Sequence, residues 1–457
     1  MPIFEKRSRL DVPAGEAFAW HERPGAFERL TPPGSSLQTV SASGGIRDGA
    51  HRVMRLGRGP LRFHWVAVHS GYQEGQQFQD EQVYGAFARW MHTHRFEPIG
   101  ETACEYVDHV DYELPLGWLG ASLGGRGTER QLRRLFEFRH ARVRNDLARH
   151  AAVSDRGSLR VAISGASGLV GSALAAFLTG GGHEVVRLVR REPEADGEVR
   201  WDPARGELDA RALEGVDAVV HLAGEGIAGR RWSPERKAAI RWSRIESTHL
   251  LASTLARLER RPRLLVNASA IGFYGDRGDE LLDEKSALGS GFLAEVCREW
   301  EAATWPAEEA GIRVAKLRIG IVLSPAGGVL RIMLGPARLG LGGSLGNGRQ
   351  FMSWIALDDL VGVIHHALFD ESLSGPVNAT APHPAPNAEV VRTLGRVLRR
   401  PSLLSVPAVL LRLAMGRELA DETALASTRA RPGRLESGGF RFLHPELESA
   451  LRAELGR

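Results

Sequence analysis

Cysteine is scarce in this chain, with only Cys104 and Cys297 among 457 residues. Two cysteines provide no disulfide framework, which suits a reducing cytoplasm. No apolar run approaches membrane-spanning length, and the first residues lack the apolar core of a signal peptide. The 59 basic residues nearly balance the 55 acidic ones, so the charge does not argue for a nucleic-acid partner. We therefore expect a cytoplasmic protein with no membrane span and no bound nucleic acid.

A chain of 457 residues is too long for one ordinary core, so two or three domains are expected. Residues 1–152 contain strand-like runs at about 4–12, 61–70, 77–84, 88–96 and 104–112, followed by a long basic helix. Strands and helices alternate from residue 158 onward, with one helix predicted over about 291–311. A short polar linker separates the two parts. We predict domains at 1–152 and 158–400, with residues 401–457 forming a small C-terminal cap.

A glycine-rich turn follows a short apolar strand at residues 161–163 and precedes a helical pattern. Its glycines are Gly165, Gly168 and Gly171, and each has a separate steric role. Gly165 allows the tight turn, Gly168 lets backbone approach a phosphate, and Gly171 lets the helix pack on the strand. Backbone N–H groups at a helix N-terminus attract a pyrophosphate. The pattern predicts a dinucleotide-binding turn.

The second strand, at residues 184–190, ends in Arg190 and Arg191. An acidic residue at this place would accept hydrogen bonds from a ribose 2′-hydroxyl group. Guanidinium groups match a 2′-phosphate instead, so NADP(H) is favoured over NAD(H). A third buried strand, at residues 217–224, ends in Gly224, which can approach the cofactor. The alternation of strands and helices predicts an α/β Rossmann-type fold with a doubly wound parallel sheet.

The N-terminal part predicts an antiparallel sheet closed by one long helix at about residues 128–150. The apolar positions of this helix are Leu132, Phe136, Val143 and Leu147. Trp90, His92, His94 and Phe96 share one face of a strand, because side chains alternate along it. Two histidines at this spacing could bind a metal, with His64 or His69 as a third ligand. No carboxylate or cysteine cluster completes such a site in the sequence, so we expect the histidines to line a cavity or to hydrogen-bond internally, with no metal.

Residues 1–150 resemble the START-like (SRPBCC), polyketide-cyclase-type ligand-binding domains. The motifs that carry this resemblance lie at residues 18–21, 30–33, 90–96 and 138–140. The resemblance implies an α+β helix-grip domain with a pocket for an apolar or amphipathic small molecule.

Residues 159–455 resemble the epimerase-like branch of the extended short-chain dehydrogenase/reductase superfamily. The matching motifs lie at 164–171, 221–225, 231–232, 243–244, 268–275, 292–301, 345–355, 358–359, 375–379, 418–421 and 439–442. The resemblance implies NADP(H)-dependent epimerase or reductase chemistry on a small organic substrate. It places the cofactor against Gly165, Ser167, Gly168, Leu169, Val170, Gly171, Arg190, Arg191, Leu222, Ala223, Gly224, Arg244, Ala268 and Ser269. It places the substrate against Glu225, Arg349, Gln350, Ser353 and Trp354.

The superfamily usually transfers protons with a Tyr-x-x-x-Lys pair, in which the lysine lowers the pKa of the tyrosine. By family register the pair falls at Phe292 and Val296 or at Leu293 and Cys297, so it is missing here. Three interpretations remain. In the first, Ser269 and Tyr274 supply the acid or base with help from Cys297 or Glu301. In the second, the cofactor is bound without turnover, as in a sensor or scaffold. In the third, the N-terminal domain carries an apolar ligand.

Overall fold

The computed structural model describes residues 2–57 and 59–457. These residues form two compact units. Unit 1 contains residues 2–57 and 59–157 together with 176–182 and 456, and unit 2 contains most of the remainder. Within the described residues, no helix combines the length and the apolar character that crossing a membrane requires.

Unit 1 is built on a seven-stranded antiparallel sheet with strand order β1-β7-β6-β5-β4-β3-β2. Its strands are β1 (Ile3–Leu10), β2 (Gln38–Ser43), β3 (His51–Leu56), β4 (Phe63–Gln73), β5 (Gln77–Tyr84), β6 (Arg89–Ile99) and β7 (Ala103–Glu113). Helices α1 (Ala14–Glu22) and α2 (Ala26–Leu30) lie between β1 and β2 in the chain. The sequence predicted β1 and β4–β7 within a few residues but did not identify β2 and β3.

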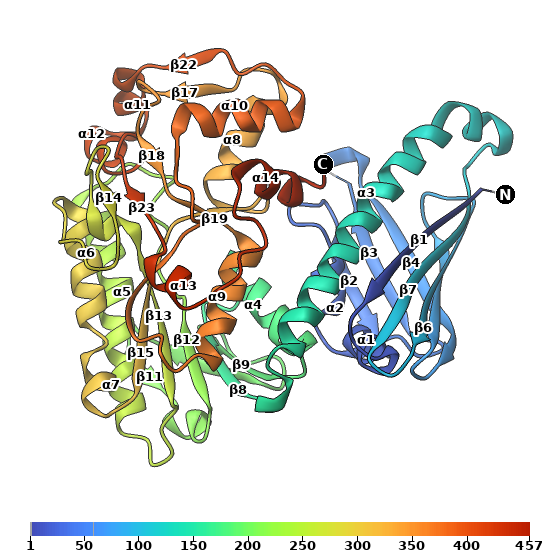
Figure 1. Cartoon of the computed structure of the whole chain (residues 1–457), viewed down its shortest axis with the longest axis horizontal. Coiled ribbons are helices and arrows are strands. Elements are labelled where there is room, and N and C mark those ends of the chain that lie inside the picture. The colour runs from blue at the N-terminus through green and yellow to red at the C-terminus, as the bar shows by residue number, and fades with distance from the viewer. Residues whose placement is uncertain (1, 58) are drawn as a thin grey trace. The chain divides into compact units, whose positions relative to one another are not determined.

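The long helix α3 (Gly117–Ala151) contacts β1 and β7 of this sheet (Figure 1). The apolar positions predicted for its inner face are all buried, namely Leu132, Phe136, Val143 and Leu147. The helix begins eleven residues before the predicted start at 128. The prediction started too late because residues 117–127 are rich in glycine, which has a low helix propensity. The antiparallel sheet and the long helix predicted for the N-terminal part of the chain are therefore present.

Unit 2 contains an eight-stranded sheet with strand order β11-β10-β9-β8-β12-β13-β15-β20. Its pairs are parallel except β10 with β11. The strands are β8 (Arg160–Ser164), β9 (Glu184–Val189), β10 (Glu198–Asp202), β11 (Glu207–Leu208), β12 (Ala218–His221), β13 (Leu264–Ala270), β15 (Arg313–Ile319) and β20 (Gly375–Ala379). After β10 the chain returns past β8 to add β12 on its other side, so the order of strands reverses between β8 and β12.

Helices cover both faces of this sheet, as the continuously buried strands β8 and β12 require (Figure 1). α5 (Pro234–Ala256), α6 (Phe292–Ala302) and α7 (Trp305–Glu309) lie on one face, and α4 (Leu169–Gly180) and α9 (Leu357–Phe369) lie on the other. The sequence predicted one helix over residues 291–311. The structure divides it into α6 and α7, with Pro306 in the first turn of α7, where its missing N–H is tolerated. The doubly wound parallel sheet is confirmed.

The remaining C-terminal elements surround α8 (Gly328–Arg338) and α10 (Asn387–Leu398), which share a core with Trp354 and with α14 (Leu447–Leu455). The other helices are α11 (Ala408–Met415), α12 (Arg417–Leu419) and α13 (Gly433–Ser437). Four two-stranded sheets complete this part: β14 (Leu281–Leu282) with β23 (Arg429–Ala430), β16 (Ile321–Leu323) with β19 (Trp354–Ala356), β17 (Gly343–Leu345) with β22 (Leu404–Val406), and β18 (Phe351–Met352) with β21 (Ala385–Pro386).

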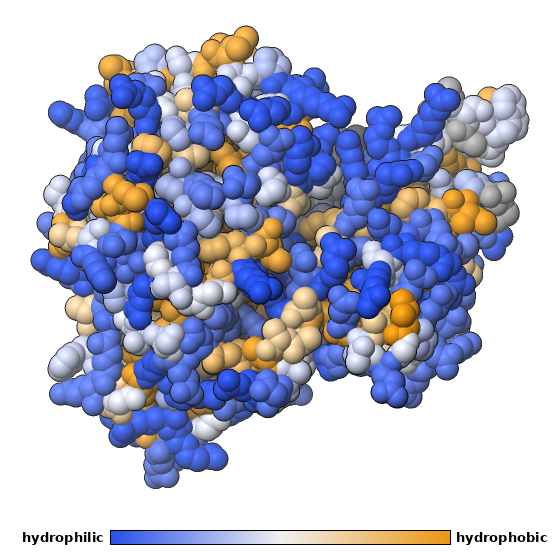
Figure 2. Space-filling model, in the orientation of Figure 1, coloured by the Kyte–Doolittle hydropathy of each residue, from blue (hydrophilic) through white to orange (hydrophobic). Residues whose placement is uncertain are grey.

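The apolar side chains of α11 are not buried. The helical apolar spacing of Leu403, Val406, Leu410 and Leu413 predicted a segment that caps the domain, and Leu410 and Leu413 are 54% and 63% exposed. Leu403, before β22, is 90% exposed. Figure 2 shows hydrophobic atoms over β22 and α11 at the upper end of unit 2. The helical apolar spacing in this segment therefore marks a surface rather than a core.

An internal ion pair ties α2 to α3 in unit 1, and it supplies a stability test. Arg29 donates to both carboxylate oxygens of Asp146 at 2.7 and 2.6 Å, and both side chains are buried. We expect Asp146→Asn to lower the free energy of unfolding by about 3–5 kcal/mol, because it removes the charge that compensates a buried guanidinium. Urea unfolding followed by tryptophan fluorescence measures the change.

The matched control is Asp11→Asn, which removes the partner of Arg9 in an exposed pair. We expect that change to cost less than about 0.5 kcal/mol. Equal losses for the two variants would contradict the assignment of a buried pair.

Candidate nucleotide site

The turn between β8 and α4 is shaped by two close backbone approaches. Gly165 has φ +70°, and a Cβ atom there would lie 2.9 Å from the carbonyl carbon of Leu222. A Cβ atom on Gly171 would lie 2.2 Å from the carbonyl oxygen of Gly165. Neither position accepts a side chain without movement of backbone, so the turn and the first turn of α4 need these glycines.

Gly168 differs from the other two glycines, because a Cβ atom there would meet only the Gly165 carbonyl oxygen, at 3.2 Å. Ser167 and Gly168 are exposed, whereas Leu169 and Val170 are half-buried at the start of α4. The open part of the turn thus coincides with the N-terminus of a twelve-residue helix. This arrangement leaves backbone N–H groups and the positive end of the helix dipole available to an anion.

A hydrogen-bonded chain that the sequence did not predict joins the carboxyl ends of β8 and β12. The Ser164 hydroxyl group accepts hydrogen bonds from the N–H groups of Leu222 and Ala223 at 3.2 and 3.3 Å, and it lies 2.6 Å from His221 Nδ1. His221 Nε2 lies 3.2 Å from the Ser247 hydroxyl oxygen. Burial lowers the pKa of His221 to about 3, so the ring is neutral and accepts the Ser164 proton. The chain fixes the backbone at Leu222 and Ala223.

Arg244 lies beside the end of β12. It donates to the carbonyl oxygens of Glu225 and Ile240 at 2.9 and 3.1 Å, and its guanidinium carbon lies 5.0 Å from the Trp300 ring centre. A Cβ atom on Gly224 would be 3.5 Å from that carbon. Burial lowers the pKa of Arg244, yet the group remains cationic because its ordinary value is far above neutral. A largely buried positive charge therefore lies against the exposed Gly224 backbone.

Further guanidinium groups surround this edge of the sheet. The hydrogen bond from Arg236 lowers the pKa of Glu225, and the charges of Arg236, Arg190 and Arg244 add to the shift. Arg190 is exposed, whereas Arg191 donates to both oxygens of Glu198 at 2.8 and 2.6 Å. The two arginines predicted to contact one phosphate are therefore in different states, and Arg191 is engaged by a carboxylate.

The three predicted catalytic side chains lie near the end of β13 but are enclosed. Ser269 donates to Glu301 at 2.7 Å, and Glu301 accepts two hydrogen bonds from the buried Arg318 at 2.8 and 2.9 Å. Ala268, on the same strand, is buried. The Glu301–Arg318 pair was not identified from the sequence, because its residues lie on α6 and β15 and no local pattern links them.

Tyr274 is fully buried in the short helix η4 (Ile271–Tyr274). Its hydroxyl group lies 2.7 Å from Asn378 Oδ1 and 2.9 Å from the Asp283 carbonyl oxygen, and it accepts from Arg318 at 3.0 Å. Burial raises the pKa of Tyr274. This hydroxyl group therefore already has one donor and two possible acceptors within the protein.

Leu293 and Cys297, on α6, face the backbone just after β13. A Cβ atom on Gly272 would lie 3.4 Å from Leu293 Cβ and 3.7 Å from Cys297 Sγ. Two registers were considered for the tyrosine–lysine pair. The register that places it at Leu293 and Cys297 brings both residues close to the end of β13. Phe292 instead contacts Trp232, and Val296 is buried. An apolar side chain and a thiol therefore stand where the pair would be.

The predicted substrate residues separate into two groups. Gln350, Ser353 and Trp354 are buried, and their polar atoms bond to backbone: Gln350 to Leu345 and Ala424, Ser353 to Thr428 and Ala430, and Trp354 to His383. Glu225 and Arg349 reach solvent. Glu225 and Arg349 are therefore the two solvent-accessible members of the predicted set.

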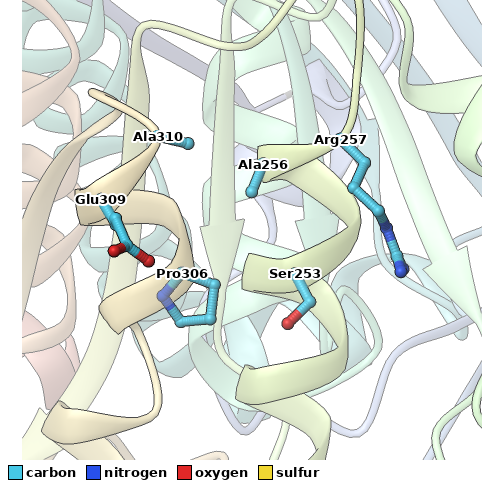
Figure 3. Close-up of a pocket in the computed structure, with 6 residues that line it drawn as sticks. All are labelled: Ser253, Ala256, Arg257, Pro306, Glu309 and Ala310. Atoms are coloured by element: carbon cyan, nitrogen blue, oxygen red, sulfur yellow. The ribbon is translucent and has the colours of Figure 1, made fainter.

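A shallow pocket lies at the other edge of the sheet (Figure 3). It is lined by Ser253, Ala256, Arg257, Pro306, Glu309 and Ala310, from the end of α5 and from α7 with the residue that follows it. α5 connects the carboxyl end of β12 to the amino end of β13, so its last turn lies at the amino edge. Ligands of doubly wound sheets bind at the carboxyl edge, where the strand order reverses. This pocket is not the nucleotide site.

A parallel doubly wound sheet, a glycine turn at its switch point and a basic carboxyl edge define a nucleotide-binding α/β protein. The profile of the NAD dependent epimerase/dehydratase family matches residues 161–378, and a domain of unknown function, DUF1731, matches residues 406–454. An epimerase family protein of Mycobacterium bovis is 48% identical over 291 residues, which span 64% of this chain and 96% of that protein. The chain belongs to this epimerase family.

Two solved structures extend the comparison. The nucleoside-diphosphate sugar epimerase from Corynebacterium glutamicum has a TM-score of 0.82 and 36% identity, and the match covers 99% of this chain and 90% of that one. Human epimerase family protein SDR39U1, solved with NADPH, has a TM-score of 0.60 and 34% identity over 64% of this chain and 98% of the human one. The first match therefore includes unit 1, which the second lacks.

Cys297 provides a chemical test of the enclosed site. Burial raises the pKa of the Cys297 thiol to about 12, so roughly one molecule in ten thousand carries the thiolate near pH 8. We expect iodoacetamide to leave Cys297 unmodified in the folded protein and to alkylate it in urea, as measured by peptide mass spectrometry. Rapid labelling of the folded protein would show a reactive thiol and contradict this assignment.

Proposed function

We propose that unit 2 binds NADP(H) at the carboxyl ends of β8, β9 and β12. The observation that carries this proposal is the open turn at Ser167 and Gly168, together with the Arg244 guanidinium group against Gly224 and the exposed Arg190 after β9. The turn and α4 would hold the pyrophosphate, Arg190 and Arg191 the 2′-phosphate, and the backbone at 222–224 the adjoining parts of the nucleotide. The human relative solved with NADPH supports this choice of cofactor.

Arg244 and Arg191 fit an anionic ligand in different ways. Arg244 has its guanidinium group fixed by backbone carbonyl oxygens, so it is oriented before any ligand arrives. Arg191 is held by Glu198 and would have to share its hydrogen bonds with a phosphate. We therefore assign more of the preference for the 2′-phosphate to Arg190, which is exposed at the end of β9.

We propose that the bound cofactor serves reductase- or epimerase-type chemistry on a small organic substrate. A nicotinamide supplies or accepts a hydride when bound. The chain contributes no tyrosine–lysine pair at the strand end, where Leu293 and Cys297 form an uncharged wall. The proton that accompanies the hydride would therefore come from water or from the substrate. Glu225 and Arg349 are the exposed polar side chains assigned to substrate binding.

A second candidate function is an NADPH-dependent sensor or scaffold. The observation that favours it is the engagement of Ser269, Tyr274 and Cys297, which are each buried or hydrogen-bonded within the protein. In this case the cofactor would change the affinity for a partner without being consumed. The two candidates predict the same cofactor affinity and differ only in turnover.

The START-like relationship of unit 1 remains a proposal that rests on its strand order and on α3. A sheet closed by one long helix supports it. The space between α3 and the sheet holds aromatic clusters around Phe18 and Phe136 and a polar cluster around Asp108. Mass spectrometry of small molecules that co-purify with the full chain would identify an apolar ligand if one is carried.

Cofactor preference is testable by fluorescence titration. We expect NADPH to bind at least about tenfold more tightly than NADH, because a charge-assisted hydrogen bond to the 2′-phosphate contributes roughly 1.5–3 kcal/mol. Arg190→Ala should remove most of this preference and leave the affinity for NADH unchanged. Arg187→Ala, on the same strand but away from its end, is the matched control and should bind both cofactors normally. Tighter binding of NADH by the native protein would overturn the assignment.

Turnover is tested with NADPH and a panel of carbonyl compounds and nucleotide sugars. A reductase would oxidise NADPH when its substrate is present, and an epimerase would convert a sugar with no net change in absorbance. We expect Tyr274→Phe to lower stability by about 1–3 kcal/mol, because it leaves buried partners unsatisfied, and to leave kcat of the folded protein unchanged. A large fall in kcat without loss of stability would restore Tyr274 as the acid or base. No reaction with any compound would favour the sensor.

A further inference from the structure

A cluster of two carboxylates and three imidazoles lies inside unit 1. Asp80 is on β5, His92 and His94 are on β6, Asp108 is on β7 and His140 is on α3. In the sheet Asp80 is directly opposite His92, and His94 is directly opposite Asp108. Directly opposed residues point to the same face of a sheet, so the register brings these groups together. The sequence showed the two histidines but not this register.

Asp108 fixes which nitrogen of each ring carries a proton. Its Oδ1 lies 3.0 Å from His92 Nε2 and 2.7 Å from His94 Nδ1, and its Oδ2 lies 3.0 Å from His140 Nε2. A carboxylate only accepts hydrogen bonds, and Asp108 is fully buried among these rings. Each of these three nitrogens is therefore a donor toward Asp108.

The opposite nitrogens of the two β6 histidines face Asp80. Its Oδ2 lies 3.0 Å from His92 Nδ1 and 3.4 Å from His94 Nε2. In a neutral ring, a nitrogen opposite the protonated one presents a lone pair. Two lone pairs directed at a carboxylate oxygen repel it, and either a metal ion among the three atoms or a proton on a ring nitrogen would remove that repulsion.

We propose that Asp80, His92 and His94 bind a divalent transition-metal ion of the kind that takes imidazole nitrogen and carboxylate oxygen, with Zn²⁺ as the reference ion. The three donor atoms lie within 4.8 Å of one another. Metal–ligand bonds of about 2.0–2.1 Å in a tetrahedron place donors about 3.3 Å apart, close to the separations from Asp80. A metal-bound histidine usually donates its other ring N–H group to a carboxylate, which fixes the orientation of the ring. Asp108 would be that carboxylate for both His92 and His94.

The site has an open side. The Asp80 side chain is 19% exposed, whereas those of His92 and His94 are 2% and 7% exposed. Three protein ligands leave a tetrahedral ion one further position, which water or a small oxyanion would occupy. The Phe78 ring stacks on His94 at 4.2 Å and covers one flank of that ligand. The ion would thus be accessible from the Asp80 side and enclosed elsewhere.

The alternative occupant is a proton. Burial lowers the pKa of His92, but the carboxylates of Asp80 and Asp108 outweigh that effect and raise it to about 9. A proton on His92 Nδ1 would form a hydrogen bond with Asp80 and remove the repulsion between these two atoms. In that case no metal ion is needed to hold them together. The experiment must therefore separate a bound metal from a bound proton.

The test uses the full-length protein, stripped with a chelator and titrated with Zn²⁺ near neutral pH in competition with a chromophoric chelator. We expect one zinc ion per chain with sub-micromolar affinity, and an X-ray absorption spectrum of nitrogen and oxygen ligands with imidazole scattering and no sulfur. Asp80→Asn should weaken binding by more than about tenfold, and Asp108→Asn by about ten- to a hundredfold through misorientation of the rings.

Glu81→Gln is the matched control, since Glu81 adjoins Asp80 on β5 but points to the other face of the sheet. It should bind zinc as the native protein does. Absence of zinc binding by the native protein at micromolar concentrations, or equal binding by Asp80→Asn and Glu81→Gln, would overturn the proposal. A sulfur or all-oxygen ligand set in the native protein would do so as well, even if a variant failed to fold.

Discussion

The contact between the Gly165 turn and the end of β12 is the constraint on which the nucleotide site depends. No side chain fits between the Gly165 α-carbon and the backbone of Leu222 and Ala223. The Ser164 hydroxyl group holds the same two residues by hydrogen bonds. These contacts lie where the strand order reverses, so they set the position of α4, of the Gly224 backbone and of Arg244 relative to one another. The close approach of Gly165 to Leu222 and Ala223 therefore helps to place Arg244 at the carboxyl edge of the sheet.

The sequence predicted the parts of the fold that depend on local chemistry. Buried parallel strands appear as continuous apolar runs, and the glycine turn identified β8, α4 and their function together. The buried positions Leu132, Phe136, Val143 and Leu147 of α3 followed from helical periodicity. β2 was missed because all six of its residues are exposed and Val40 is its only large apolar residue. The sequence of α11 shows the opposite case. Its apolar residues have helical spacing, yet none of them is buried.

The details of the site could be predicted only in part, because they depend on contacts between distant segments. The absence of the tyrosine–lysine pair was visible in the sequence, but what fills its place was not. Glu301 on α6 and Arg318 on β15 form a buried ion pair that also holds Ser269 and Tyr274. Such a pair is costly to desolvate and strongly destabilising to break, so these hydroxyl groups are fixed by a rigid framework. Asp80 was missed for a similar reason, since only the strand register places it opposite His92.

The two edges of the unit 2 sheet have a consequence for self-association. At one edge β11 is only two residues long and runs against its neighbour. At the other edge, Arg434 donates to the carbonyl oxygens of Ser374 and Pro376, and Glu284 accepts from the Asn378 N–H group. Short strands and edges whose polar groups are already bonded offer no template for pairing with a strand of another molecule. Copies of this unit would therefore have to associate through helices and loops, and its sheet is protected from growing into an intermolecular one.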